Sequence, residues 1–315
     1  MEDYPRTILE LEDRFLTEEA CREYLMRLRW PTGFVCPRCQ TDGGWPATRG
    51  RVVCQACRYQ ASVTAGTVFQ DTHKPLRLWF RAIWHVVSQK NGASAVSVQQ
   101  ILGLGSYRTA WTWLHKLRRA MVRPGRDRLH GRIEVDETQV GGEKADADGQ
   151  RSGRKMLVVI AAEEDGRGIG RIRMARIPDK ARATLPAFVQ RAIGPGTVVH
   201  TDGLMAYRGL ETMGYEHEAT ALLGQEKDAA LRLLPRVHRV ASLLKRWLLG
   251  THQGAVSVEH LDYYLDEYTF RFNRRKSRSR GKLFYRLLQQ ALQVDPAPYK
   301  AVGGSKHPEP GRHNI

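Results

Sequence analysis

The sequence predicts a mixed α/β protein in which a small cysteine-rich module and a helical segment precede a larger α/β domain. Two observations lead to this prediction. Four cysteines near the N-terminus are spaced as two close pairs, and from about Gly131 the apolar residues change from helical spacing to the alternating and continuous runs of strands. The chain has 315 residues, of which 42% are hydrophobic, so it is long enough for two or three domains with their own cores.

The cysteine pairs predict a structural zinc site. Cys36 and Cys39 form one C-x-x-C pair, Cys54 and Cys57 form the other, and 14 residues lie between the pairs. Two such turns present four thiolates in the tetrahedral arrangement that Zn²⁺ prefers, and because protein fills all four positions the ion has no open position for catalysis. A redox dithiol needs only one pair, and iron–sulfur clusters usually have different spacing. Cys21 stands alone on a helix predicted at Glu18–Arg29, so we expect it to be a buried apolar residue.

The charge of the chain predicts a polyanionic partner. The formal net charge is +17, from 50 Lys and Arg against 33 Asp and Glu, and nucleic acid is the commonest polyanion that such an excess attracts. The alternative is a basic protein with no such partner. We expect no membrane partner, because no stretch approaches the roughly 20 apolar residues of a membrane span. The acidic segment 1–5 also lacks the apolar run of a signal peptide, so the expected location is the bacterial cytoplasm, at the nucleoid.

The segment after the cysteine module has the pattern of a helix-turn-helix. Apolar spacing predicts helices at Pro75–Val87, Ser97–Leu102 and Tyr107–Val122, and a glycine-bearing turn at Gly103–Ser106 separates the last two. A short turn followed by a basic helix is typical of units that bind double-stranded DNA, although an ordinary helical hairpin with a solvated basic face is the alternative. Five side chains of the last helix are predicted to face outward: Arg108, His115, Lys116, Arg118 and Arg119. The four cations among them are our predicted DNA contacts.

Strands dominate the chain after Gly131. The continuous apolar run Met156–Ala162 is typical of a strand buried on both faces. The other predicted elements are strands at Arg132–Val140, Ile169–Ile177 and Thr197–Gly203, and helices at Arg182–Ile193, Pro235–Gly250 and Val258–Asn273. Three strands, a helix, a strand and further helices are the order of an RNase H-like α/β domain.

Two aspartates in these strands are candidate metal ligands. Asp136 lies inside the first predicted strand and Asp202 at the end of another, so their side chains meet if the two strands are neighbours. Paired carboxylates hold Mg²⁺ through hard oxygen ligands, and two such ions roughly 3.5–4 Å apart promote phosphodiester displacement. The alternative is that each aspartate is an ordinary turn or cap residue. On the helix after Pro235, His238 and Lys245 lie two turns apart on one stripe.

These features together resemble the transposases of the IS1595 family, which carry an ISXO2-like catalytic domain. The resemblance extends from about Leu25 to Gln290. Besides the cysteine module, it rests on the segments Gly66–Thr72, Pro75–Phe80, Val135–Gly142, His200–Gly203, Ser242–Arg246 and Tyr268–Arg275. It implies an RNase H-like fold of the acidic-triad transposase class, divalent-metal cleavage at the ends of a mobile element, and joining of the freed 3′-hydroxyl to target DNA.

The resemblance also implies roles for single residues. Asp136 becomes the first metal ligand and Asp202 the second. The family's third ligand is usually Glu or Asn, followed seven residues later by a basic residue; Lys245 matches the basic position, and seven residues before it stands His238. Histidine is a softer ligand than a carboxylate and less suited to Mg²⁺, so Mn²⁺ is expected to support activity better than Mg²⁺.

Two interpretations of this departure stay open. The chain uses an Asp-Asp-His triad, or it has lost the third ligand and is catalytically impaired. Glu226, Asp228 and Glu259 lie near enough in sequence to replace the third ligand, but none has the partner lysine at the required offset.

The predicted organisation has four segments. Residues 1–70 form an N-terminal helix and zinc ribbon, 71–127 the helix-turn-helix-like domain, 128–280 the RNase H-like catalytic domain, and 281–315 a C-terminal helix with a disordered tail. The basic run 274–280 includes two further predicted DNA contacts, Arg274 and Arg275, or it serves only solubility.

Three functions are compatible with this organisation. The first is a transposase that binds double-stranded DNA at transposon ends and target, expected by analogy to act as a homo-oligomer. The second is a catalytically silent DNA-binding protein derived from one, and the third is a structure-specific nuclease of the same fold. The sequence has no phosphate-binding glycine loop, so we expect no nucleotide cofactor.

Overall fold

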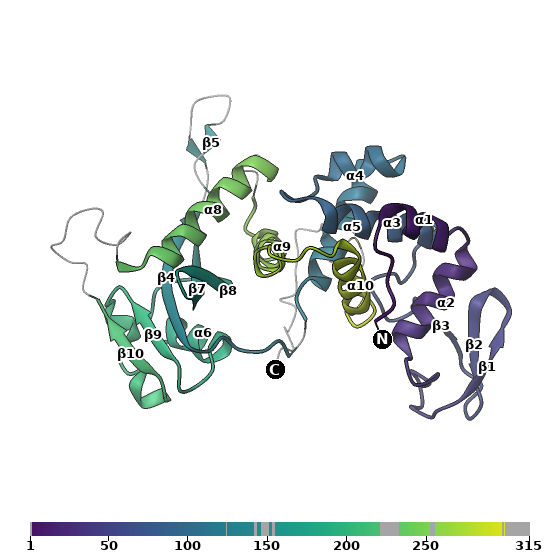
Figure 1. The fold of residues 1–315 in the computed structure, drawn as a ribbon, viewed down its shortest axis with the longest axis horizontal. Helices are drawn as coiled ribbons and strands as arrows, with labels where there is room; N and C mark the ends of the chain where they lie inside the picture. Colours follow the sequence, from purple (N-terminus) through teal and green to yellow (C-terminus); the bar gives the residue numbers. More distant parts are fainter. Residues whose placement is uncertain are drawn as a thin grey trace. The chain divides into compact units, whose positions relative to one another are not determined.

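The chain forms two compact units in the computed structural model (Figure 1). The structure describes residues 2–123, 125–141, 144–145, 151–152, 155–220, 233–252, 256–297 and 299. The first unit comprises Met1–Pro124 together with Ser277–Ile315, and the second comprises Gly125–Lys276. The segment after residue 281, which the sequence suggested as a separate element, therefore contributes its helix to the first unit.

The first unit combines a small sheet with a set of helices. Its three-stranded antiparallel sheet has the order β1-β2-β3. The strands are β1 (Gly44–Ala47), β2 (Arg51–Cys54) and β3 (Gln60–Ser62), with a 3-10 turn η1 (Thr48–Gly50) between the first two. The helices are α1 (Ile8–Arg14), α2 (Glu18–Arg29), α3 (Leu76–Ser88), α4 (Ala95–Leu102), α5 (Tyr107–Ala120) and α10 (Arg280–Ala291).

Aromatic packing holds the helices of this unit together. Trp79 of α3 stacks on Trp113 of α5 with ring centroids 3.8 Å apart, and Phe80 of α3 meets Phe284 of α10 edge to face at 5.6 Å. All four rings are buried, which places the C-terminal helix in the same core as the helices that precede the second unit.

Helices α4 and α5 are joined by the predicted glycine turn. Gly103 ends α4 in the left-handed region with φ 61°, a conformation that costs glycine little, and Leu104 N–H donates to the Gln99 carbonyl at 2.9 Å. Ser106 occupies the N-cap position of α5, but its side chain makes no capping hydrogen bond. The predicted outward orientation is wrong at two positions of α5, since His115 is 0% and Arg118 is 2% exposed.

The burial of Arg118 has a tertiary cause. A one-sided helix was the expectation, but α5 packs against α4 and also against α10, which follows it by about 160 residues. Packing against two helices covers more of α5 than the one-sided pattern predicted.

The second unit is built on a five-stranded sheet with the order β10-β9-β4-β7-β8. Strand β7 runs antiparallel to both of its neighbours, β4 and β8, whereas β9 and β10 run parallel to β4. Their bounds are β4 (Arg132–Val140), β7 (Met156–Asp165), β8 (Gly168–Ile177), β9 (Val198–Thr201) and β10 (Glu216–Ala219). Two short antiparallel strands, β5 (Lys144–Ala145) and β6 (Arg151–Ser152), lie between β4 and β7 in the chain.

Helices cover both faces of this sheet, as Figure 1 shows. One face packs against α8 (Pro235–His252) and α9 (Leu261–Asn273) through the core that contains Val158 and Ile160. The other face packs against α6 (Thr184–Ala192) and the 3-10 turn η2 (Met205–Tyr207) through the core that contains Val159 and Ala161. A further 3-10 turn, η3 (Glu211–Met213), precedes β10. The prediction that the apolar run of β7 is buried on both faces is therefore confirmed.

The sequence patterns missed or misplaced several features. Strand β10 was not predicted, and β9 ends at Thr201, so Asp202 stands just beyond the strand rather than within it. Of the predicted disordered tail, residues 298 and 300–315 lie outside the described part of the chain. Among the described residues, no helix is both long and apolar enough to cross a membrane.

Candidate functional site

The four paired cysteines come together at one end of the small sheet. Cys54 is the last residue of β2, and the two closest Sγ pairs are Cys36–Cys57 at 3.7 Å and Cys39–Cys54 at 3.6 Å. All four sulfur atoms lie within 4.8 Å of one another. Four thiolates at about 2.3 Å from a tetrahedral zinc ion stand about 3.8 Å apart, so this set fits the ion. Cys21 takes no part, because it is a buried residue of α2, as predicted.

The second candidate site lies where β9 ends beside β4. Glu134 of β4 stands opposite His200 of β9 in a parallel register. Two residues further along the same register, Asp202 follows the end of β9 at the level of Asp136, which lies inside β4. Because side chains alternate along a strand, Asp136 shares the face of Glu134, which is the face that α8 covers.

Helix α8 brings His238 to this pair. Its Nε2 atom lies 3.6 Å from Asp136 Oδ2, is buried, and makes no hydrogen bond within the described part of the chain. Two ligands of one ion at about 2.1 Å each stand about 3–3.6 Å apart, so this pair of donors suits a shared divalent cation. Asp202 is not as close: among the described residues, the four cysteines are the only group of three or more donors that all lie within 4.8 Å of one another.

A buried glutamate fixes the position of α8. Glu134 is 3% exposed, and its Oε2 accepts hydrogen bonds from the backbone N–H of Arg236 at 2.7 Å and of Val237 at 2.9 Å. These are orphan donors at the first turn of the helix, where a negative charge also complements the helix dipole. Arg236 completes the arrangement by pairing with Glu134 at 2.9 Å and with Glu164 at 2.6 Å. Because His238 follows within one turn, this cap sets its distance from Asp136.

Glu134→Gln is expected to destabilise the protein by about 1–3 kcal/mol, because the buried charge-assisted bonds to Arg236 and the helix N-terminus are weakened. The measurement is urea unfolding followed by circular dichroism. Glu164→Gln is the matched control: Glu164 pairs with the same arginine, but its side chain is 30% exposed, so its loss should cost under about 1 kcal/mol. Equal losses in the two variants would show that Glu134 does not anchor α8.

The electrostatics of the site favour a neutral histidine and a partly protonated aspartate. Burial raises the pKa of Asp136 to about 7, and the charges of Glu137 and Asp202 act in the same direction. Burial lowers the pKa of His238; Lys245 lowers it further, whereas the charges of Glu134 and Asp202 oppose the shift. At neutral pH the imidazole nitrogen is therefore available to a cation, and a bound cation would ionise Asp136.

Lys245 is exposed on α8 and acts electrostatically on His238, consistent with the stripe that the sequence predicted. The other candidates for a third ligand are not part of the site as described. Glu259 is exposed and belongs to no ligand cluster among the described residues, and Glu226 and Asp228 lie outside those residues.

Three residues beside this site were missed from the sequence. The side chain of Glu137, the residue after Asp136, is 0% exposed and faces the α6 side of the sheet. The Tyr207 hydroxyl donates a hydrogen bond to it, and Lys180 Nζ lies 2.9 Å from its Oε2. The available signal for Glu137 was its position two residues after Val135, because alternation along the strand puts both side chains on the same face. The other two approach from loops distant in sequence, so no local pattern indicates them.

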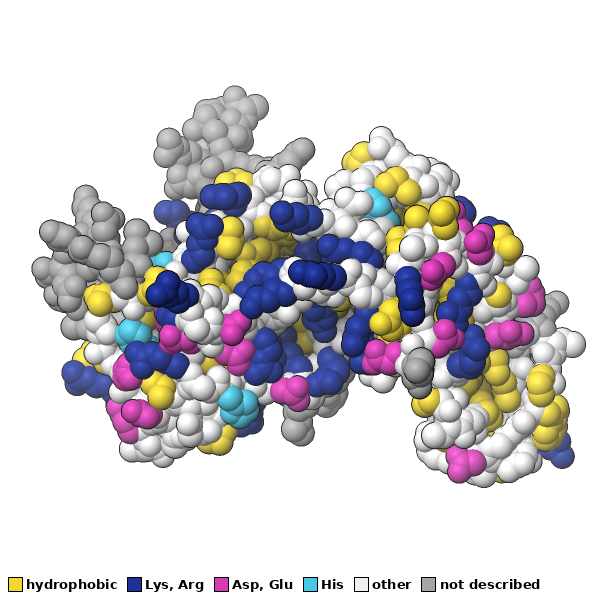
Figure 2. All heavy atoms as spheres, in the orientation of Figure 1, with side chains coloured by type: hydrophobic (Ala, Val, Ile, Leu, Met, Phe, Trp, Pro, Cys, Tyr) yellow, Lys and Arg dark blue, Asp and Glu magenta, His cyan; other side chains and the backbone are white. Residues whose placement is uncertain are grey.

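The predicted DNA contacts of α5 differ in accessibility. Arg108 is exposed at the start of the helix, with its guanidinium 3.6 Å from the ring centre of Tyr299. Lys116 and Arg119 are half-buried, and burial lowers the pKa of Lys116. Arg118 is buried, so we withdraw it as a DNA contact. The exposed cations of α8 are Arg239, Lys245 and Arg246. Figure 2 shows Lys and Arg side chains at the surface in the region of this helix.

Arg274 and Arg275 both have partners within the second unit. The Arg274 guanidinium lies 4.1 Å from the ring centre of Phe270. Arg275 donates hydrogen bonds to the carbonyls of Phe272, Gly170 and Ile169. It thereby holds the end of α9 against the start of β8, a structural task that the sequence did not indicate.

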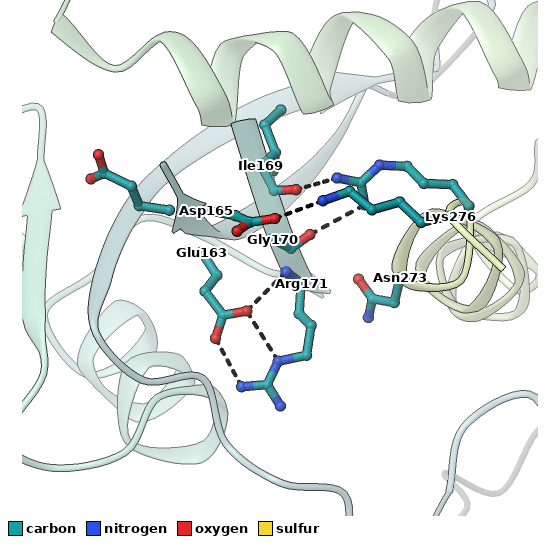
Figure 3. A pocket seen from close by; sticks show the side chains of 9 residues that line it. Glu163, Asp165, Ile169, Gly170, Arg171, Asn273 and Lys276 are labelled. Atoms are coloured by element: carbon teal, nitrogen blue, oxygen red, sulfur yellow. Dashed lines mark hydrogen bonds and ion pairs between the residues drawn. The ribbon is translucent and has the colours of Figure 1, made fainter. Parts of the chain in front are cut away.

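A hollow of about 290 Å³ lies beside this contact (Figure 3). In it Asn273 binds the backbone of Ile172 on the edge strand β8 through both side-chain atoms, at 2.7 and 3.1 Å. Lys276 pairs with Asp165 at 2.7 Å, and Glu163 pairs with Arg171 at 2.8 Å. The charged groups around the hollow thus neutralise one another, and none of the predicted metal ligands lines it.

Comparison with known proteins agrees with this geometry. The ISXO2-like transposase domain matches residues 128–273, and the transposase zinc-ribbon domain matches residues 16–60, so the two models together cover more than half of the chain. Over 287 residues the chain is 25% identical to an uncharacterized protein in transposable element ISH50 of Halobacterium salinarum, and the match covers 85% of this chain and 94% of that protein. The chain therefore belongs to the IS1595 family of transposases, with its zinc-ribbon segment in the first unit and its transposase domain in the second.

Proposed function

We propose that this transposase binds the ends of its insertion sequence and catalyses divalent-metal-dependent cleavage and strand transfer of DNA. The observation that carries the proposal is the contact between Asp136 and His238, whose donor atoms lie 3.6 Å apart beside the end of β9. This distance is too long for a hydrogen bond between His238 Nε2 and Asp136 Oδ2. The imidazole nitrogen has no other hydrogen-bond partner in the described chain. Asp136 Oδ1 accepts a hydrogen bond from the Glu137 backbone N–H at 2.8 Å, so the group without a partner is the buried imidazole nitrogen, which is expected where a cation belongs.

The sheet supports assignment of the catalytic domain to the RNase H-like fold. Three antiparallel strands precede two strands that are parallel to the first, and the first strand lies at the centre of the sheet. Helices lie on both faces. Asp136 lies on the first strand, and Asp202 follows the end of the adjacent strand β9, which supports the assignment of both to an acidic-triad site.

We assign the divalent cation, Mg²⁺ or Mn²⁺, to Asp136, Asp202 and His238. Such an ion supplies Lewis-acid activation of the nucleophile and stabilises charge on the leaving oxygen. The protein positions the donors: β4 and β9 hold the carboxylates, and the cap from Glu134 holds α8 and therefore the imidazole. Lys245 adds positive charge beside the site for the DNA backbone.

DNA recognition is assigned to the first unit and to α8. The zinc ribbon serves as a structural module, and α4 and α5 form a helix-turn-helix-like pair that presents Arg108, Lys116 and Arg119. Arg274 and Arg275 are assigned to the DNA backbone as well, although their guanidinium groups also have partners within the second unit. Joining two DNA ends to one target calls for more than one active site, so we propose a homo-oligomer on DNA.

The proposal is tested by incubating the full chain with a labelled DNA end from the sequence flanking its gene, with Mg²⁺ or Mn²⁺. The intact protein is expected to cut the end and join it to a target. Asp136→Ala, Asp202→Ala and His238→Ala are each expected to yield no product above background while still binding the end. Ser242→Ala on the same helix is the control, since within the described residues its hydroxyl donates one hydrogen bond, to the His238 carbonyl at 3.0 Å.

Each other outcome contradicts a defined part of the proposal. Activity retained by His238→Ala alone places the third ligand elsewhere. Binding of the end without any cleavage by the intact protein indicates a silent DNA-binding protein. Hydrolysis without strand transfer or preference for the ends indicates a structure-specific nuclease.

A further inference from the structure

A buried ionic pair lies directly behind the proposed metal site. Glu137 follows Asp136 on β4 and points to the opposite face of the sheet, where its side chain is fully buried. Its carboxylate has two partners, the Tyr207 hydroxyl and the Lys180 amine, the latter at 2.9 Å. Tyr207 follows Asp202 by five residues, and Lys180 lies in the loop between β8 and α6, so both loops meet at this carboxylate.

Only one member of this group faces solvent. The side chain of Lys180 is 44% exposed, whereas Glu137 and Tyr207 are buried. Partial burial opposes ionisation of the amine, but the hydrogen bond and charge of Glu137, together with the charges of Asp136 and Asp202, raise the pKa of Lys180. The amine is therefore a positive charge that interacts with Asp136 and Asp202 and is partly exposed to solvent.

Stability alone does not explain why Lys180 pairs with the buried Glu137 carboxylate. A buried charged pair pays a large desolvation cost, and apolar residues of similar volume are usually at least as stable. The pair has another consequence: the salt bridge to Glu137 of β4 restricts the long side chain of Lys180. A flexible lysine loses conformational freedom when it binds a ligand, and one that is already held loses less.

We propose that Lys180 binds the backbone phosphate of the DNA strand at the cleavage site, and that Glu137 and Tyr207 position it there. The inference rests on the proposed function, because it places DNA at Asp136 and Asp202. A phosphate brought to these carboxylates adds negative charge to a cluster that already holds three acids. The Lys180 amine, which is held by Glu137 and interacts electrostatically with both aspartates, offsets that repulsion and aligns the phosphate.

The test measures whether Lys180 and the phosphate act on each other. Labelled DNA ends with either a normal phosphate or a single uncharged methylphosphonate at the cleavage position are titrated with the full chain in Ca²⁺. For the intact protein, removing the phosphate charge is expected to weaken binding about 10-fold. For Lys180→Gln, normal DNA should bind about 10-fold more weakly, and the methylphosphonate should cause no further loss. Lys180→Arg should restore most of the sensitivity to the phosphate charge.

Two further variants separate phosphate binding from structural support. Lys180→Gln leaves the buried Glu137 carboxylate without its cation and is therefore expected to lower the thermal unfolding midpoint. Adding Glu137→Gln removes that charge and should restore the midpoint, while binding stays insensitive to the methylphosphonate. Lys155→Gln, an exposed lysine just before β7, is the matched control and should behave as the intact protein.

Two results would overturn the inference. One is a full 10-fold loss on methylphosphonate DNA in Lys180→Gln, which shows that the lysine does not contact this phosphate. The other is recovery of phosphate sensitivity together with stability in the double variant, which shows a structural role alone. Failure of the intact protein to cleave normal DNA would instead contradict the proposed function, so the two failures are distinguishable.

Discussion

Asp136→Asn is expected to raise the thermal unfolding midpoint of the protein at pH 8 without added Mg²⁺ or Mn²⁺, while it lowers cleavage by about 10³-fold or more. Burial, and then the neighbouring charges of Glu137 and Asp202, raise the pKa of this carboxyl group from 3.8 to about 7. The folded protein therefore holds an unfavourable charge above pH 7, and asparagine removes it while keeping nearly the same shape.

The sign of the pH dependence follows from the direction of the shift. Below about pH 4 the carboxyl group is protonated in both the folded and unfolded states, so it adds no pH dependence. Between pH 4 and 7 the unfolded state releases the proton first, so stability falls as the pH rises, and above pH 7 the loss is complete. The loss is up to about 4 kcal/mol, and its recovery in Asp136→Asn corresponds to an increase of about 5–10 °C at pH 8.

Thermal unfolding from pH 4 to pH 8, with and without Mn²⁺, checks this prediction. Mn²⁺ should raise the midpoint of the intact protein at pH 8, because it binds only the folded state, and should have no such effect on Asp136→Asn. Asp165→Asn is the control: this exposed carboxylate pairs with Lys276, and that hydrogen bond lowers its pKa, so its removal should slightly destabilise the protein. If Asp136→Asn is less stable than the intact protein at pH 8, the ionised Asp136 carboxylate does not destabilise the metal-free folded state, and the prediction is wrong.

Cys54→Ser is expected to release zinc and unfold the cysteine module. The small sheet has few buried residues of its own, so the metal must supply most of its stability, and structural zinc sites contribute roughly 10–16 kcal/mol. Elemental analysis should find one zinc per intact chain and none in the variant, and limited proteolysis should cut the variant between residues 36 and 57. Binding of the DNA end is expected to weaken with the loss of the module.

Cys21→Ala is the matched control for this loss. Cys21 is as buried as Cys54 but lies on α2, away from the four sulfur atoms. The variant should keep one zinc per chain and lose only a modest amount of stability to the missing sulfur atom. One zinc per chain in Cys54→Ser would show that the four cysteines do not form the site.

The local parts of the candidate sites could be predicted from the sequence. Two C-x-x-C pairs bring their thiolates together within single turns, so their spacing alone predicted the cluster of four sulfur atoms. The bounds of α2 and β4 also agree with their sequence patterns. Apolar periodicity indicates where a helix or strand begins and ends and which of its faces is buried. The placement of Asp136 on β4 followed from the same pattern.

The tertiary structure alone decided the partners of these elements. Glu134 caps a helix that begins about 100 residues later, Lys180 reaches Glu137 from a distant loop, and α10 packs against α5, the helix in which Arg118 is buried. Each of these contacts depends on strand order and helix packing. The apolar periodicity of a segment gives no information about either. Sequence thus determined the family, the zinc-type cluster and the strand that holds the first aspartate. Folding determined which charges are buried, since burial depends on neighbours that come from anywhere in the chain.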